Sequence, residues 1–353
     1  WGDLRQYTTT VAMGDIDAVR VALGAGRIDL VGGSYGTRAA LEYLRQFPRA
    51  VRRTVLDGVA PPDMALPASL STDSQAALDG LLAACAAEAR CRERYPALHE
   101  TLERLLASLP READVAQPFT GRVERLVVER EFVLGLLRAP LYAPWVAAAL
   151  PEAITEAAAG RLDALAGLAS VLAGGGARSS RLAEGMHFSV LCAEDVPRLA
   201  LGNNPPGADF GQGDADFYRA ACAQWPRGAV PAAFYVVPAA PSATLVLSGG
   251  ADPATPPRHG ARVARALGAR ARHVVVPAAG HGTLMLPCVR EAAMRFIDAA
   301  DDAAALAVDA DCARALPRPG VFVPVGGAVA GVPGRAPTPA PGAAARTPQG
   351  GRR

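Results

Sequence analysis

The sequence has 353 residues, of which 50% are hydrophobic and 20% are charged, and its formal net charge at pH 7 is +2. This length allows one large domain or two ordinary ones, and a core large enough to fold unaided. The basic residues are scattered singly, and no apolar run reaches the roughly 18 residues that span a bilayer. Composition therefore argues against nucleic-acid and membrane partners.

Residues 1–60 carry the pattern of a parallel sheet. We expect one helix over residues 1–23, followed by a short buried strand at 28–31 that ends at glycines. A helical stretch comes next, and a second strand covers 54–57 before Gly58. Strand, helix and strand within about thirty residues predict a βαβ unit.

Residues 61–240 have a different character. They are rich in alanine, leucine, glutamate and arginine, and no strand pattern in them is convincing. A loop rich in glycine, proline and asparagine at 203–213 interrupts the helical stretches. We therefore predict a mostly helical insertion. Its expected helices lie near residues 78–94, 97–109, 130–137 and 150–172.

The α/β pattern resumes in residues 241–316. Its expected strands are 243–248 and 273–276, and its expected helices are 257–267 and 289–299. Because only four strands are visible, the strand at 28–31 would be an unprotected edge. We therefore expect that this chain lacks N-terminal strands of the complete protein. Residues 317–353 are rich in proline, glycine, alanine and arginine, and we expect a disordered tail there.

The strongest motif is Gly32-x-Ser34-x-Gly36, which lies between a predicted strand and a predicted helix. This is the context of a nucleophile elbow, in which glycines allow a sharp turn that exposes the serine hydroxyl. The following helix directs its positive end toward developing negative charge. The motif predicts Ser34 as a nucleophile, although a tightly packed glycine-rich turn would have the same pattern.

A nucleophilic serine needs a base, and the base needs an orienting acid. In α/β-hydrolases these residues follow in the order serine, acid, histidine. Asp252 and His281 have this order, and each follows the end of a predicted strand. We therefore predict that Ser34, Asp252 and His281 meet at one edge of the sheet and form a catalytic triad.

Other residues compete for these roles. Asp57 also ends a strand and is the main alternative to Asp252, although an aspartate before Gly58 is also a common turn residue. The glycine-rich exit loop around Asp252 favours that residue, because its carboxylate would lie at the tip. The other histidines, which are weaker candidates for the base, are His99, His187, His259 and His273.

The six cysteines form three pairs that are close in sequence: Cys85 with Cys91, Cys192 with Cys222, and Cys288 with Cys312. Sequence alone does not fix their connectivity. None has the spacing of a zinc site. An even number of separated cysteines favours disulfides and an oxidising compartment, against the alternative of six buried free thiols.

Four segments together resemble the proline iminopeptidase and tripeptidyl aminopeptidase family of serine α/β-hydrolases. They are VGGSYGTR at 31–38, LDGVAPP at 56–62, LSGGADPATPP at 247–257 and AGHG at 279–282. The resemblance extends to about residue 319, and the helical insertion matches the family's cap. The C-terminal part is similar to the module of secreted tripeptidyl aminopeptidases (TAP-like), including Cys288 and Cys312.

The resemblance implies an α/β-hydrolase fold in which Ser34 is acylated, His281 is the general base and then acid, and Asp252 orients it. The backbone N–H of Tyr35 would be one oxyanion donor. The family also carries a His-Gly-Gly-Pro-Gly type loop that supplies the other donor, and this sequence contains no such loop. Loss of one oxyanion donor costs on the order of 10²–10³ in rate.

The resemblance also implies that acidic groups of the cap bind the substrate ammonium. Glu194 and Asp195 resemble such a segment, although an ordinary exposed acidic pair after a helix would have the same sequence. A carboxylate in a partly dry pocket would attract the ammonium and hydrogen-bond to it. A bridge between Cys192 and Cys222 would hold this segment in place.

These observations predict a serine hydrolase, specifically an aminopeptidase that releases residues or short peptides through an acyl-enzyme. The alternatives are an esterase with the same triad, and a catalytically impaired fragment that lacks the oxyanion loop. We expect no metal and no organic cofactor, a small peptide or ester as substrate, and a monomer. Cysteine usage and the resemblance predict a secreted or periplasmic protein.

Overall fold

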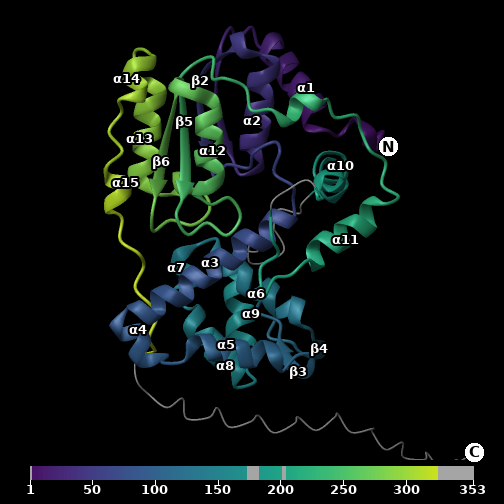
Figure 1. Ribbon diagram of the computed structural model, residues 1–353, viewed down its shortest axis with the longest axis vertical. Helices are drawn as coiled ribbons and strands as arrows, with labels where there is room; N and C mark the ends of the chain where they lie inside the picture. Colours follow the sequence, from purple (N-terminus) through teal and green to yellow (C-terminus); the bar gives the residue numbers. More distant parts are fainter. Residues whose placement is uncertain (1, 173–182, 201–203, 325–353) are drawn as a thin grey trace, which may run out of the picture. The chain divides into compact units, whose positions relative to one another are not determined.

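A four-stranded parallel sheet is the centre of the protein, in a computed structural model that describes residues 2–172, 183–200 and 204–324. All neighbouring strands are parallel. Their carboxyl ends therefore lie at the same edge of the sheet. In spatial order the strands are β1 (Ile28–Gly33), β2 (Val51–Asp57), β5 (Thr244–Gly249) and β6 (Ala271–Val276) (Figure 1).

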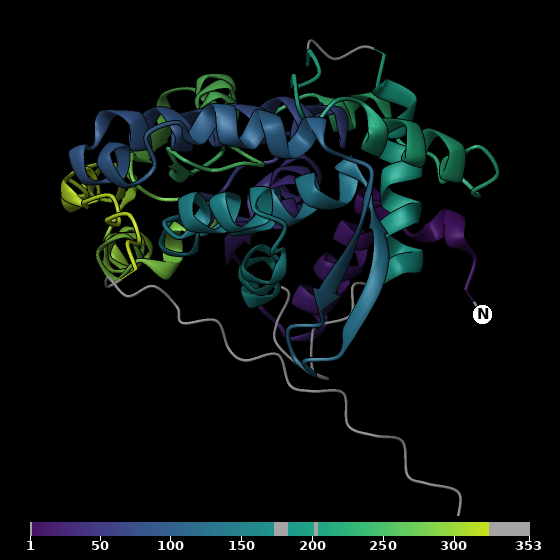
Figure 2. The same cartoon turned by 90° about the horizontal axis from the view of Figure 1, so that it is seen from below.

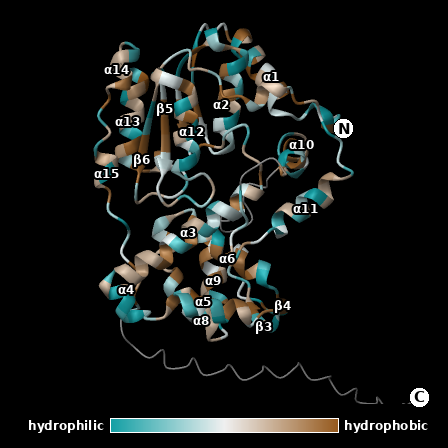
Figure 3. Cartoon of the chain, in the orientation of Figure 1, coloured by the Kyte–Doolittle hydropathy of each residue, from teal (hydrophilic) through white to brown (hydrophobic). Residues whose placement is uncertain are grey.

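Helices cover both faces of this sheet. Side chains alternate along each strand, so neighbouring residues pack against helices on opposite faces. In β2, Val55 packs into one apolar cluster and its neighbour Leu56 into another. The Leu56 cluster includes residues of α1 (Thr9–Ala22), α2 (Tyr35–Gln46) and α12 (Pro257–Leu267). The Val55 cluster includes residues of α13 (Pro287–Asp298), α14 (Asp302–Leu306) and α15 (Cys312–Ala315). Figure 3 shows the hydrophobic colouring of the strands between these layers.

The N-terminal segment differs from the single helix expected over residues 1–23. A short 3₁₀ turn covers Leu4–Gln6, and α1 begins only at Thr9. The reason is Thr8, whose extended backbone and hydroxyl cap the helix by accepting the N–H of Val11.

The insertion between β2 and β5 is a cap with its own apolar core. Buried side chains from seven of its helices and from a small sheet form that core. Most are leucine, valine, isoleucine or alanine, and Cys85, Cys91 and Tyr95 complete the cluster. The helices are α3 (Ala68–Ala87), α4 (Ala89–Arg94), α5 (Leu98–Ala107), α6 (Arg130–Leu141), α7 (Pro144–Ala147), α8 (Leu150–Ala158) and α9 (Asp163–Leu172). Two further helices, α10 (Glu184–Glu194) and α11 (Gly213–Cys222), complete the described cap. None of the described helices combines the length and apolar character needed to cross a membrane.

The prediction that the insertion contains no strands was wrong. An antiparallel hairpin, β3 (Arg111–Ala116) with β4 (Val123–Val128), projects from the cap helices (Figure 2). Its apolar alternation is weak, because only Val115 and Val128 are buried among its residues. Gly121, with φ +66°, lies in the turn.

Two of the expected cap helices are each divided into two. The stretch predicted at 78–94 breaks at Glu88, whose extended backbone caps α4 while its carboxylate accepts the N–H groups of Arg90 and Cys91. The stretch predicted at 150–172 breaks after Ala158, where Gly160 has φ +94°. Caps and left-handed glycines end helices even where the apolar pattern continues.

Three disulfides crosslink these elements. They join Cys85 to Cys91, Cys192 to Cys222, and Cys288 to Cys312, so each bridge lies within a sequence-local pair. The first connects α3 with α4, the second α10 with α11, and the third α13 with α15. No cysteine in the described part of the chain is free.

The segment that follows α15 belongs to the compact unit, which extends to Phe322, although we expected the tail to begin at residue 317. Its end is anchored to the cap: the N–H of Phe322 donates to Ala148 O (2.9 Å), and Tyr95 Oη donates to Phe322 O (2.9 Å). We call residues 316–322 the strap. Most of the expected tail, residues 325–353, lies outside the described residues.

Candidate active site

Ser34 lies on a strained turn between β1 and α2. Its φ of 53° is the only positive value of a non-glycine residue in the described chain. A Cβ on Gly32 would lie 2.4 Å from Gly36 O, so only glycine fits where the turn closes. The Ser34 N–H donates to Asp57 O (2.9 Å), which fixes the turn to the end of β2. Such strain in a turn fixed by its surroundings is typical of functional sites.

Tyr35 is the first residue of α2. The N–H groups of a helix's first turn have no partner within the helix and lie at its positive end. The position fits the predicted role of Tyr35 as an oxyanion donor.

Asp252 and His281 are brought together from the loops after β5 and β6. His281 Nδ1 lies 2.8 Å from Asp252 Oδ2. Because a carboxylate only accepts, Nδ1 carries the proton and Nε2 is left as the acceptor in the neutral ring. Asp252 is 2% exposed and also accepts the N–H groups of Ala254 and Thr255 and the Thr255 hydroxyl. The pair thus has the geometry of an orienting acid and a base.

The two pKa shifts agree with an ionised acid beside a basic imidazole. Burial alone would raise the pKa of Asp252, but the hydrogen bond and charge of His281 and two backbone N–H groups lower it below its usual range. Burial alone would lower the pKa of His281, but the hydrogen bond and charge of Asp252, together with the charge of Asp57, raise it above 6.5. His281 therefore binds a proton more readily than an ordinary histidine.

Asp57, the rival acid, is held elsewhere. Its carboxylate accepts the N–H and hydroxyl of Thr283 and the N–H of Leu284, so it fixes the loop after His281. Gly58, with φ +64°, brings the β2 backbone against the imidazole: a Cβ there would lie 3.1 Å from His281 Cε1. The end of β2 therefore touches both the Ser34 turn and the His281 ring.

The other histidines have different partners. His273 Nε2 lies 3.0 Å from Ser248 Oγ, and His259 Nε2 lies 2.8 Å from Asp73 Oδ2. His187 Nε2 lies 2.7 Å from Tyr218 Oη, and His99 is exposed beside Glu103. Asp252 is thus next to His281 and to none of these.

Glu194 and Asp195 lie at the end of α10 and are buried rather than exposed. Asp195 binds Arg38 through both oxygens, at 2.8 and 2.9 Å, and accepts the N–H of Leu66. Glu194 accepts the N–H of Thr9 (2.6 Å) and its hydroxyl (3.0 Å). The exposed acidic pair that the sequence also allowed is thereby wrong, and the substrate-binding role stays a prediction.

Glu194 is nevertheless connected to the elbow. Thr9 Oγ1 gives its hydrogen to Glu194 and accepts that of Tyr35 Oη (2.7 Å), so two hydrogen bonds separate the carboxylate from the residue after Ser34. Burial raises the pKa of Glu194 to about 6, although Arg38 and Thr9 act in the opposite direction.

Three residues near the site were missed by the sequence reasoning. Thr255 lies 3.1 Å from His281 Nδ1, and Tyr142 of the cap contacts the same ring edge-on while its O accepts the His281 N–H (2.9 Å). Arg38, four residues after Ser34, holds Asp195. Thr255 and Arg38 lie within the quoted motifs and could have been found there, whereas no sequence signal marks Tyr142.

The parallel sheet, the elbow at Ser34 and the paired Asp252 and His281 define a serine α/β-hydrolase. A family described as TAP-like protein matches residues 210–306, which begin in the cap and extend through the Asp252 and His281 loops. The chain is therefore a serine α/β-hydrolase with a TAP-like module, as the sequence predicted.

The chain is similar to the serine protease Hip1 of Mycobacterium tuberculosis and of Mycobacterium bovis. In each case it is 26% identical over 274 residues, which are 72% of this chain and 52% of the relative. The chain thus spans about half the length of these relatives. Among solved structures, the esterase EaEST from Exiguobacterium antarcticum matches with a TM-score of 0.33 and 14% identity, over 84% of this chain and 75% of that one.

Proposed function

We propose that this chain carries the active site of a serine peptidase that acts at the free amino end of peptides and releases residues or short peptides. The paired Asp252 and His281 beside the Ser34 turn carry the hydrolase part of the proposal. The similarity to a serine protease supports peptide bonds as the target. The buried carboxylate of Glu194 beside the elbow supports recognition of an ammonium.

The proposed chemistry is that of a Ser-His-Asp triad. His281 Nε2 takes the proton of Ser34 Oγ as the oxygen attacks the scissile carbonyl, and the N-terminus of α2, with the Tyr35 N–H as a donor, would stabilise the negative carbonyl oxygen. His281 then gives its proton to the departing amine, which leaves an acyl-enzyme at Ser34. A water molecule, deprotonated by His281, attacks the acyl carbon and releases the acid, and His281 returns the proton to Ser34 Oγ. Asp252 stabilises the charged imidazole during both steps.

The amino end of the substrate would be recognised through charge. Arg38, Glu194 and Asp195 lie together without exposure, and one guanidinium and two carboxylates leave a net charge of −1 when Glu194 is ionised. A negative charge in a poorly hydrated region attracts a nearby ammonium more strongly than it would in water. An N-blocked substrate, which has no ammonium, would lose this attraction.

The test is hydrolysis of matched substrates by the chain and its Ser34→Ala variant. The panel contains aminoacyl and tripeptidyl p-nitroanilides, their N-acetyl forms and p-nitrophenyl esters. We expect Ser34-dependent cleavage of the free-amino peptides, with a preference over the N-acetyl forms that falls in Glu194→Gln. Ser34-dependent cleavage of esters alone would replace the peptidase with an esterase, and no Ser34-dependent turnover would contradict both.

We further propose that the protein works in an oxidising compartment, as a secreted or periplasmic protein. The three disulfides support this, because such bridges persist where thiols are not kept reduced. Mass spectrometry of protein isolated without reductant should find all six cysteines bridged, and free thiols would contradict the proposal.

A further inference from the structure

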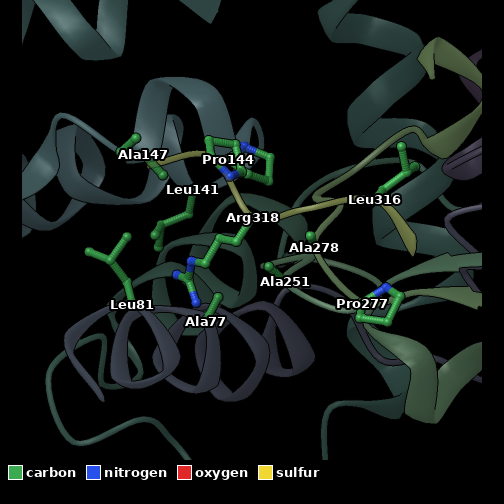
Figure 4. Close-up of a pocket in the computed structure, with 12 residues that line it drawn as sticks. Ala77, Leu81, Leu141, Pro144, Ala147, Ala251, Pro277, Ala278, Leu316 and Arg318 are labelled. Carbon is green, nitrogen blue, oxygen red and sulfur yellow. The ribbon is translucent and has the colours of Figure 1, made fainter. Parts of the chain in front are cut away.

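A cavity of about 310 Å³ lies between the core and the cap (Figure 4). Its walls come from α3, from the end of α6, from α7 and the residue after it, from the loops after β5 and β6, and from the strap. This volume is at the lower end of the range, about 300–1,000 Å³, in which small-molecule sites fall.

The lining of this cavity is apolar except for one residue. Eleven of its twelve residues are alanine, leucine or proline, and the twelfth is Arg318 of the strap. Figure 4 shows the Arg318 side chain extending across the cavity, with its guanidinium beside Leu81 and Ala77 of α3. Arg318 has no hydrogen bond or ion pair among the residues that the structure describes. The residue is exposed, so it presents a solvated cation, without an ion-pair partner in the described part of the chain, to a cavity that is otherwise lined by apolar residues.

One acid, Glu88, lines an adjoining cavity together with Arg318, but it forms no ion pair with Arg318 in the described structure. Both oxygens of Glu88 accept backbone N–H groups of α4 instead. Partial burial lowers the pKa of Arg318, although the side chain keeps contact with solvent. A carboxylate that entered the cavity would find a partner there, because guanidinium and carboxylate form charge-assisted, often bidentate hydrogen bonds.

The cavity adjoins the catalytic histidine. A smaller cavity of about 100 Å³ is lined by His281 and its flanking glycines, and it shares Pro144, Ala278, Leu316 and Pro319 with the Arg318 cavity. In the proposed mechanism His281 protonates the departing amine, so the leaving segment of a substrate lies on the side of His281. A ligand that continues from there enters an apolar space that ends at a cation.

We infer that the Arg318 cavity binds the C-terminal carboxylate of the peptide segment that leaves from the active site, with an apolar side chain against its walls. The inference rests on the proposed function and deepens it. It makes short peptides with a free carboxyl end the favoured substrates, because only there does the carboxylate lie close enough to the scissile bond to reach Arg318.

Binding without turnover tests the inference separately from the proposed function. The Ser34→Ala protein is titrated with acetyl-leucine and with acetyl-leucinamide, which differ in the charge of one end, and dissociation constants are measured by ligand-detected NMR. We expect the acid to bind about ten-fold more tightly than the amide. The preference should vanish when Arg318→Met is added and persist in part with Arg318→Lys. Arg314→Met is the matched control, because Arg314 is exposed on α15 and lines neither cavity.

Equal binding of acid and amide, or a preference that Arg318→Met leaves intact, would overturn the inference. Turnover supplies a second arm: KM for a tetrapeptide with a free carboxyl end should be about ten-fold lower than for its amide, and Arg318→Met should remove this ratio without lowering kcat. An Arg318-dependent binding preference without Ser34-dependent cleavage of either peptide would refute the proposed peptidase while leaving the carboxylate site in place.

Discussion

Replacing Gly58 with alanine tests whether the end of β2 positions the catalytic imidazole. Gly58 has φ +64°, and a Cβ there would lie 3.1 Å from both His281 Cε1 and Thr255 Oγ1. An alanine would therefore be unfavourable in two ways. One is the left-handed backbone, about 1–2 kcal/mol of stability. The other is a contact that the imidazole relieves by moving a few tenths of an ångström.

The second cost can be converted into a rate. A displacement of 1 Å in a catalytic group costs about a hundredfold, so a shift of roughly 0.3 Å should lower kcat about fourfold. KM should change little, because Gly58 contacts the imidazole and not the cap acids. The His281 titration, followed by NMR of the imidazole, should move with kcat, since the hydrogen bond to Asp252 sustains the raised pKa.

Gly24→Ala is the matched control. Gly24 has φ +66°, and a Cβ there would have no neighbour within 4 Å. This variant should therefore lose stability through the left-handed backbone alone. Both variants should lose similar free energy of unfolding in urea, but only Gly58→Ala should lose turnover. If Gly58→Ala keeps the turnover and the imidazole titration of the parent, the end of β2 does not position His281.

Three further predictions concern the buried charges. Asp252→Asn should lower kcat by on the order of 10³–10⁴. In the parent, kcat/KM should rise with pH through a value above 6.5, because His281 must lose its proton to act as a base. A rise centred at or below pH 6.5 would contradict the raised pKa of His281. Arg38→Met should lower the free energy of unfolding in urea by about 3–5 kcal/mol, because Asp195 loses its counter-charge. Adding Asp195→Asn should restore part of this stability. If the losses of the two substitutions simply add, the two residues are not coupled. The folded pKa of Glu194 is raised to about 6 from 4.5. Stability should therefore fall as pH rises from the unfolded value to the folded value, by about 2 kcal/mol in all relative to Glu194→Gln, and should level off above it. Parallel pH profiles of the two proteins would show that Glu194 does not titrate abnormally.

The sequence predicted the central sheet well, because buried parallel strands are short apolar runs that end at glycine or proline. All four strands were found, and the helix predicted at 257–267 matches α12. The hairpin β3–β4 was missed because most of its side chains face solvent, which leaves no apolar alternation to detect. Helix breaks at Glu88 and Gly160 were missed because capping and a left-handed glycine act against a continuing apolar pattern.

The candidate site was predictable where the chemistry needs particular residues at particular strand ends. Ser34, Asp252 and His281 follow three strands of one parallel sheet, so their placement at the same edge follows from topology. The structure pairs Asp252 with His281, and the triad role of Ser34 stays a prediction. The environment of Glu194 and Asp195 was not predictable, because it depends on Arg38 of the core and Thr9 of α1, which are distant in sequence. Such contacts arise only when the cap is packed on the core.

Residues next to the predicted catalytic residues bind the cap to the core. These contacts limit how far the cap can move to admit a substrate. Arg38 follows the elbow within one turn of α2 and holds Asp195 of the cap, while Tyr142 O of the cap accepts the His281 N–H. Swinging the cap away would expose Asp195 and Arg38 separately and break the support of His281. Because separating a buried ion pair costs several kcal/mol, an open state would be a minor fraction of the population. A route that leaves the cap in place is therefore required, and the cavity lined by His281, Leu316 and Pro319 is one candidate for it.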